Sequence, residues 1–295
     1  MISAIPTVSV RRMALPLLFV LIWSSGFIAA KYSAPHASPL ALLSLRFLIA
    51  GAIMAGIALL AGARWPAAPS SRAQVLAGIL LHGTYLGPVF WVITHGMPAG
   101  VVALITGLQP FITALLAVPM LGEKLKARHV AGLMLGIFGV ALVVAPKLTS
   151  GFTGVSFFNV VLMLGAVVSI AFGTVWQKAH GGVVDLRAGA VLQYAGAAAV
   201  SLIGMAAFES PHLDLASPAL WLSLGWLVFG LSIGAISLLM LLLRRGSAGG
   251  VASLIYLVPG TTALMAYLAF GETLVLMQML GMIVCAAGVV LISRG

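Results

Sequence analysis

The second half of this chain repeats the first, 147 to 149 positions later, in a sequence that is hydrophobic almost from end to end. The segment LQPFITALLAVPMLGEKL at residues 108–125 realigns with LVPGTTALMAYLAFGETL at residues 257–274. Duplicated membrane proteins build their working site between the two copies. The shared positions are Leu108/Leu257, Pro110/Pro259, Thr113/Thr262, Ala114/Ala263, Gly122/Gly271 and Glu123/Glu272.

Residues earlier in the two halves correspond as well, and a shared hydrophobic composition alone does not explain these matches. We therefore predict two repeats, residues 1–148 and 149–295, that together form one domain. The corresponding residues are Gly26/Gly173, Lys31/Lys178, Gly78/Gly225, Gly83/Gly230 and Gly87/Gly234.

The composition requires a lipid bilayer. Hydrophobic residues make up 62% of the chain, charged residues only 7%, and the mean hydropathy is +1.20, which leaves too little polar surface for a water-soluble domain of this size. The net charge of +10 could suggest nucleic acid, but Lys and Arg separate apolar runs and form no basic arm or face. We expect a membrane protein with no nucleic-acid partner.

The basic residues predict the topology. Twelve Lys and Arg residues fall on one set of alternating connections, whereas only Lys31 and Lys147 fall on the other. By the positive-inside rule both termini are cytoplasmic. An odd number of helices per repeat then places the second copy in the opposite orientation. The ten apolar stretches long enough to span a bilayer are 13–31, 39–61, 73–95, 99–121, 128–146, 155–177, 187–208, 218–243, 248–270 and 275–293.

Glycines and prolines inside these spans indicate close packing and broken helices. GxxxG spacings at Gly83/Gly87 and Gly230/Gly234 predict close helix contacts. Pro88, Pro110 and Pro259 each remove a backbone hydrogen bond at membrane depth. Freed carbonyls are tolerated there only against protein or a water-filled cavity. The prolines therefore predict kinks or gating points, with a purely structural kink as the alternative.

Polar side chains near the membrane midplane are the candidate substrate contacts, because such groups face protein or water and avoid lipid. Two roles stay open for His82, substrate or proton binding and a hydrogen bond to a neighbouring helix. Gln109 precedes Pro110 and has an amide that can bind either end of a zwitterion. The candidates are Trp23, Ser24, His82, Tyr85, Gln109, Ser169, Ser232 and Tyr256.

The charged residues of the spans bear on energetic coupling. Arg46 lies about a third of the way into its span, and we expect its head group to reach outward to the lipid headgroups or to the extracellular mouth rather than to bind the substrate. All five acidic residues fall in connections or at helix ends, so no carboxylate at the membrane centre can relay protons. This distribution favours a facilitator, with protonation of His82 as the remaining coupled route.

The sequence lacks the motifs that would support an enzymatic function. The sequence has no HExxH helix, no pair of intramembrane aspartates and no GxxxxGK[ST] loop. We expect no enzyme activity, no metal and no cofactor. The single cysteine, Cys285, lies in the last span and is expected to be a small packing residue.

The segments LIWSSGFIAAKY (21–32), LSLRF (43–47) and the repeated proline segments together resemble the drug/metabolite transporter superfamily, in particular its EamA-type branch and the bacterial amino acid exporters within it. The resemblance covers essentially the whole chain. It implies an all-α membrane protein in which ten helices, two inverted five-helix repeats, surround a central cavity. The cavity would be lined by the first, third, fourth, sixth, eighth and ninth spans.

The resemblance also implies export from the cytoplasm across the bacterial inner membrane by alternating access. Members that carry phosphorylated sugars need cationic clamps, and no Lys or Arg is expected at the midplane here. We therefore expect neutral amphiphiles, namely amino acids and related metabolites, moving by facilitated diffusion through a protein that an inverted repeat makes complete as a monomer. The alternative is a proton-coupled multidrug or metabolite exporter.

Overall fold

The computed structural model describes residues 10–124, 127–149, 156–245, 257–273 and 275–293. Over these residues the chain is helical, and seven helices are long and apolar enough to cross a membrane. They coincide with the first four predicted spans and with the sixth, seventh and eighth. Three shorter apolar helices overlap the other predicted spans, so a total of ten spans stays a prediction.

The first half begins with two unbroken helices, which continue through Pro16 in the first and through Gly51 and Gly56 in the second. Gly62 then adopts φ +60° directly after the second helix, a conformation that favours glycine. The helices are α1 (Val10–Ser33), α2 (Pro39–Leu60), α3 (Ala68–Gly78), η1 (Ile79–Gly83), α4 (Thr84–Thr94), α5 (Ala99–Thr106), α6 (Gln109–Leu121) and α7 (Ala127–Thr149).

The second half follows the same order. Gly271 ends its penultimate helix at φ +67°, as the corresponding Gly122 ends α6 at φ +69°. The helices are α8 (Phe157–His180), α9 (Leu186–Phe208), α10 (Pro218–Gly225), η2 (Trp226–Ala235), α11 (Ile236–Arg245), α13 (Val258–Phe270) and α14 (Leu276–Ser293).

Two segments, η1 and η2, are wound as π-helix. They begin directly after Gly78 and Gly225, the first members of the repeated glycine triplets. The Thr84 hydroxyl donates to the Ile79 carbonyl, and the Ser232 hydroxyl donates to the Leu227 carbonyl, each five residues back. Such wide turns redirect side chains and occur often at functional sites.

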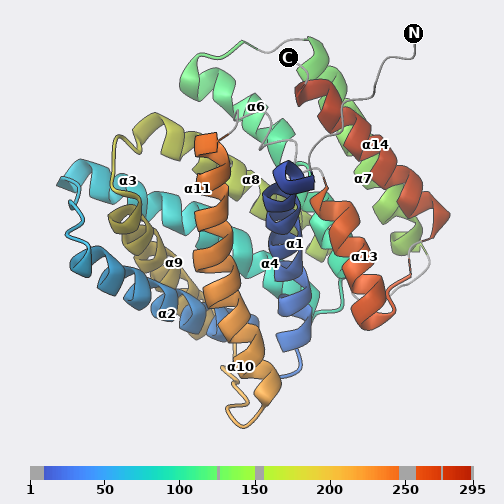
Figure 1. Ribbon diagram of the computed structural model, residues 1–295. Coiled ribbons are helices and arrows are strands. Elements are labelled where there is room, and N and C mark those ends of the chain that lie inside the picture. Colours follow the sequence, from blue (N-terminus) through green and yellow to red (C-terminus); the bar gives the residue numbers. More distant parts are fainter. Residues whose placement is uncertain (1–9, 125–126, 150–155, 246–256, 274, 294–295) are drawn as a thin grey trace.

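The helices pack in pairs that combine distant parts of the chain. At one side of the bundle α7 lies along α14, and at the other α9 packs against α2 and α3 (Figure 1). Gly139 allows the first contact, because a Cβ there would lie 2.5 Å from the Cys285 sulfur. Between these sides α1 packs against α13 and α6 against α8.

Candidate functional site

A cavity of about 440 Å³ lies inside the bundle. Its wall is mainly apolar and comes from α1, α2, α3, η1, α4, α6, α8, α9, η2 and α11. It extends from Phe27 and Phe90, deep in the bundle, to the connection between α8 and α9, residues 181–185. That connection belongs to the basic set that the charge count assigns to the cytoplasm. The resemblance did not imply the contributions of α2 and α9.

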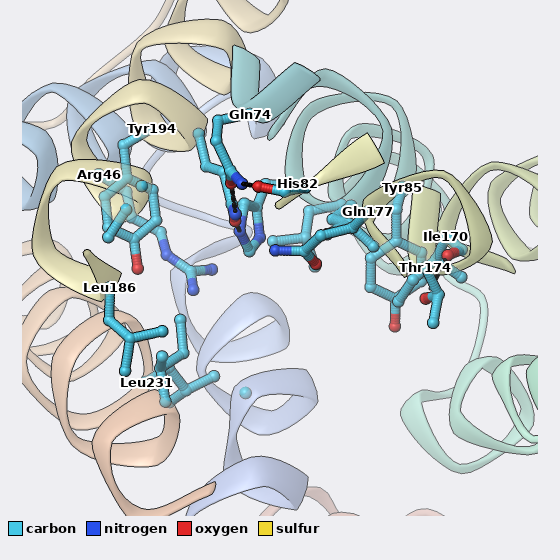
Figure 2. A pocket seen from close by; sticks show the side chains of 18 of the residues that line it. Arg46, Gln74, His82, Tyr85, Ile170, Thr174, Gln177, Leu186, Tyr194 and Leu231 are labelled. Carbon is cyan, nitrogen blue, oxygen red and sulfur yellow. Dashed lines mark hydrogen bonds between the residues drawn. The ribbon is translucent and has the colours of Figure 1, made fainter. Parts of the chain in front are cut away.

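Arg46 of α2 lies on this wall and is only 5% exposed. The expectation that its head group reaches the lipid headgroups was therefore wrong, because the guanidinium turns inward between α2 and η2. Its Nε donates to the Ser232 hydroxyl at 3.1 Å. In Figure 2 the guanidinium points into the cavity, on the wall opposite Tyr85 and Thr174. The cavity thus holds a positive charge at membrane depth, which the sequence reasoning had discounted.

A chain of amide hydrogen bonds runs along the same wall (Figure 2). The Gln193 Nε2 donates to Gln74 Oε1 at 2.7 Å, and the Gln193 Oε1 lies 3.3 Å from His82 Nε2. Gln74 in turn donates to the Gly181 carbonyl at 3.3 Å. The sequence singled out His82 but not its partners, although Gln193 occupies the repeat position of Arg46. That correspondence is the signal that could have identified it.

Three further predicted residues lie on the cavity wall. Trp23 of α1 and Tyr85 of α4 contribute aromatic rings, and Gln109 contributes its amide from the first turn of α6. Tyr85 is 5% exposed. Together with His82 these residues give the cavity aromatic faces and hydrogen-bonding groups within an apolar surround, a composition suited to small amphiphiles.

The three predicted serines lie between helices. Ser24, with no exposed surface, donates to the Val258 carbonyl of α13 at 3.4 Å. Ser169 lies 2.6 Å from the Thr84 hydroxyl and donates to the Leu80 carbonyl at 3.0 Å. Ser232 is 3% exposed and bonds Arg46. These contacts join α1 to α13, α8 to η1 and η2 to α2. The eighth candidate, Tyr256, lies outside the described residues.

The predicted prolines occupy two kinds of position. Pro88 lies inside α4, which continues to Thr94. Pro110 lies in the first turn of α6, after Gly107 and Leu108 interrupt the preceding helix. Pro259 has the corresponding place in the first turn of α13. A proline in a first turn loses no helical hydrogen bond, so Pro110 and Pro259 begin helices.

Four of the five side-chain carboxylates lie off the cavity wall and have partners there. Glu209 accepts the backbone N–H groups of Leu40 and Ala41, and Asp214 lies 3.6 Å from His36. Glu123 and Glu272 pair with lysines. These contacts leave the fifth, Asp185, as the carboxylate on the cavity wall.

Asp185 lies where the cavity meets the connection between α8 and α9. Arg187 donates to it through its backbone N–H, Nε and Nη2, at 2.8 to 3.0 Å. These hydrogen bonds lower the pKa of Asp185 to about 2. The carboxylate is therefore ionised and compensated near neutral pH, which disfavours proton binding at this position.

Two ion pairs join corresponding residues of the two halves reciprocally. Lys31 pairs with Glu272, and Lys178 pairs with Glu123 at 2.8 Å. The Lys31–Glu272 pair is more buried, with side chains 31% and 13% exposed, against 67% and 51%. Glu272 also accepts the backbone N–H of Ala99 at 3.3 Å. The first pair thus ties α1, α5 and the end of α13 together.

Among the residues described, no group of three or more His, Cys, Asp or Glu side chains could hold a metal ion. The described polar groups on the cavity wall are one guanidinium, one imidazole, the Asp185 carboxylate that Arg187 compensates, and amide and hydroxyl groups. Such a set can hold a ligand through hydrogen bonds and charge.

Comparison with known proteins gives consistent results. The uncharacterized inner membrane transporter YedA of Escherichia coli (strain K12) is 28% identical over 289 residues, covering 96% of this chain and 92% of its own. A probable amino-acid metabolite efflux pump of Salmonella typhimurium is 28% identical over 295 residues, covering 93% and 92%. A solved crystal structure that is 21% identical superposes with a TM-score of 0.65 over 96% of each chain and supports the fold alone.

The family assignment comes from a model of the EamA-like transporter family, which matches residues 12–145 and again residues 157–294. The two matches leave out little of the chain. They agree with the apolar helices and with the internal cavity. The chain is a membrane transporter and belongs to the EamA-like transporter family.

Proposed function

We propose that this protein exports amino acids and related small metabolites from the cytoplasm by alternating access, as a facilitator. The observation that carries the proposal is the cavity, which reaches the connection at 181–185 and is lined by Arg46, His82 and Gln109 within an apolar wall. The name of the Salmonella relative, an amino-acid metabolite efflux pump, supports the substrate class. We place the protein in the bacterial plasma membrane with both termini cytoplasmic, working as a monomer.

The inverted arrangement is part of the proposal and is supported by reciprocal packing. Helix α1 packs against α13 as α8 packs against α6, and the Lys31–Glu272 pair has its counterpart in Lys178–Glu123. Phe47 stacks on Tyr194, its repeat partner, with ring centroids 6.2 Å apart. Residues that correspond can meet each other only near an axis relating the two copies. Movement of one set of helices against the other about this axis would expose the cavity to each side alternately.

Transport is expected to ignore a proton gradient, because the carboxylates of the chain are paired and Asp185 is ionised at working pH. The measurement is counterflow of labelled phenylalanine by purified protein in liposomes, with and without a pH difference. Saturable exchange at equal rates supports the facilitator. Accumulation driven by the gradient would contradict it, and absence of exchange for a panel of amino acids would overturn the substrate assignment.

A proton-coupled multidrug exporter is the second candidate, favoured by the imidazole of His82 on the cavity wall. The same wall holds the Arg46 guanidinium, which disfavours lipophilic cations by charge repulsion. Competition between phenylalanine and a lipophilic cation during counterflow separates the two. The amino acid exporter predicts no competition by the cation.

Truncating the polar groups of the cavity should slow transport. His82→Ala and Gln109→Ala each remove a hydrogen-bonding group from the wall, and we expect a loss of about tenfold in the rate at low substrate concentration. His95→Ala is the control, since His95 is exposed and lies outside the cavity. Full transport by both cavity variants would show that this wall does not contact the substrate.

A further inference from the structure

Arg46 is a buried cation whose surroundings provide no anion. Its side chain is 5% exposed, and the five side-chain carboxylates of the sequence pair elsewhere, with backbone groups, lysines, a histidine or Arg187. A charge removed from water without a partner is costly. The fold nevertheless places this guanidinium at the cavity wall, where a ligand can supply the missing charge.

The guanidinium is held in a fixed orientation. Its Nε donates to Ser232, whose hydroxyl donates to the Leu227 carbonyl of η2. The Tyr194 hydroxyl donates to the Ser232 carbonyl at 2.6 Å, and the Phe47 ring lies 5.5 Å from the guanidinium carbon. Of these contacts, the Nε hydrogen bond occupies one edge of the guanidinium. The Nη1 atom is buried and has no hydrogen-bond partner among the described residues.

We propose that Arg46 is the anchor for a substrate carboxylate, which rests on the proposed function in that this cavity is the transport site. A carboxylate matches the planar fork of Arg and brings one negative charge to one positive charge. A phosphate ester would bring nearly two charges at neutral pH and would need a second cation. Among the described side chains that line the cavity, Arg46 is the one cationic group at depth.

The substrate's ammonium group has no corresponding partner. Asp185, the carboxylate on the wall, is occupied on both oxygens by Arg187, so no free negative charge lines the described cavity. Aromatic faces and amide oxygens can hold an ammonium, but they do not require one. The substrate class is therefore monocarboxylates with an apolar body, in which the amino group is dispensable. N-acylated amino acids belong to this class together with amino acids.

Three probes that share the phenylalanine side chain test the anchor. They are phenylalanine, N-acetyl-phenylalanine, which lacks the ammonium, and phenylalaninamide, which lacks the carboxylate. Binding to the purified full-length protein is measured by calorimetry, and counterflow in liposomes is measured in parallel. We expect the two carboxylates to bind within a few-fold of each other. The amide should bind about 10- to 100-fold more weakly, the loss expected for a charged hydrogen bond.

Substitutions of Arg46 should change the affinities of the three probes relative to one another. Arg46→Gln should weaken both carboxylates by about 10- to 100-fold. It should not weaken the cationic amide, because the substitution removes the charge that repels it. Arg46→Lys keeps the charge but loses the fork, and should give an intermediate loss. Arg72→Gln removes the same charge from an exposed position of α3 outside the cavity and should change nothing.

The possible outcomes distinguish a failure of the Arg46 anchor from a failure of the proposed transport function. Equal binding of all three probes to the unmodified protein overturns the anchor without any variant, as does binding of none of them. Unchanged ratios in a folded Arg46→Gln protein overturn it as well. If the carboxylates bind selectively but no probe crosses the membrane, the anchor stands and the transport function fails. If all three probes are exchanged equally, the transport function stands alone.

Discussion

Replacing Gly78 with alanine is expected to destabilise the protein by about 2 to 3 kcal/mol, the upper range for overpacking a well-packed contact. The Cβ added at Gly78 would overlap the backbone of Gln193 in α9. Backbone atoms cannot turn aside as a side chain can, so α3 and α9 would have to separate. The same contact is tight from the other side, because a Cβ at Gly196 would overlap the Val75 carbonyl.

The repeat supplies the control for this prediction. Gly225 corresponds to Gly78, but a Cβ there would meet no atom within 4 Å. Gly225→Ala should therefore be neutral or stabilise by up to about 1 kcal/mol through helix propensity. Unfolding of both variants in mixed micelles, followed by circular dichroism, measures the difference. Equal stability of the two would mean that α3 and α9 do not cross as closely as described.

Removing Lys31 has the second large expected effect. Lys31→Met leaves Glu272 only 13% exposed and without its cation, and we expect a loss of about 2 kcal/mol, reduced from the value for a fully buried pair by partial exposure. The ammonium also lies 4.8 Å from the Phe270 ring centre. Because the pair joins α1, α5 and α13, transport should fall as well. Counterflow and thermal unfolding are the two readouts.

The matched control is Lys178→Met, which breaks the corresponding ion pair. Lys178 and Glu123 are 67% and 51% exposed, and exposed pairs contribute under about 1 kcal/mol. The double variant Lys31→Met/Glu272→Gln should recover much of the lost stability, because no unpaired charge is left buried. An equal effect of the two lysine substitutions would contradict the difference in burial.

Much of the fold could be predicted because it follows from one-dimensional patterns. Apolar runs of about 20 residues can satisfy their backbone groups in a bilayer only as helices. Over the residues that it describes, the structure confirms a helical chain with seven apolar helices of spanning length. The repeated glycines predicted close contacts correctly at Gly83, whose added Cβ would overlap Val200 of α9. At Gly230 the nearest atoms belong to Trp226 of the same helix.

The candidate site was predicted only in part, since sequence does not show which face of an apolar helix meets the cavity. Soluble helices reveal that face by a polar stripe, but these helices are apolar on all sides. Trp23 lies on the cavity wall, whereas its neighbour Ser24 contacts α13. Arg46 was misread for the same reason. Its depth was known from the sequence, but the direction of its side chain depends on α9 and η2.

The stack of Phe47 on Tyr194 has a consequence for how a charge can be placed in this cavity. An assembly of two identical chains would put the same residue at both positions of each repeat pair, so the cavity would hold a second arginine where Gln193 now lies. Two guanidinium groups in one apolar cavity would repel each other. Fusion of the two copies into one polypeptide removes that constraint. The first copy keeps the cation, and the second carries a neutral amide. A ligand with one charged end can then bind in a single orientation, although the scaffold around it is symmetric.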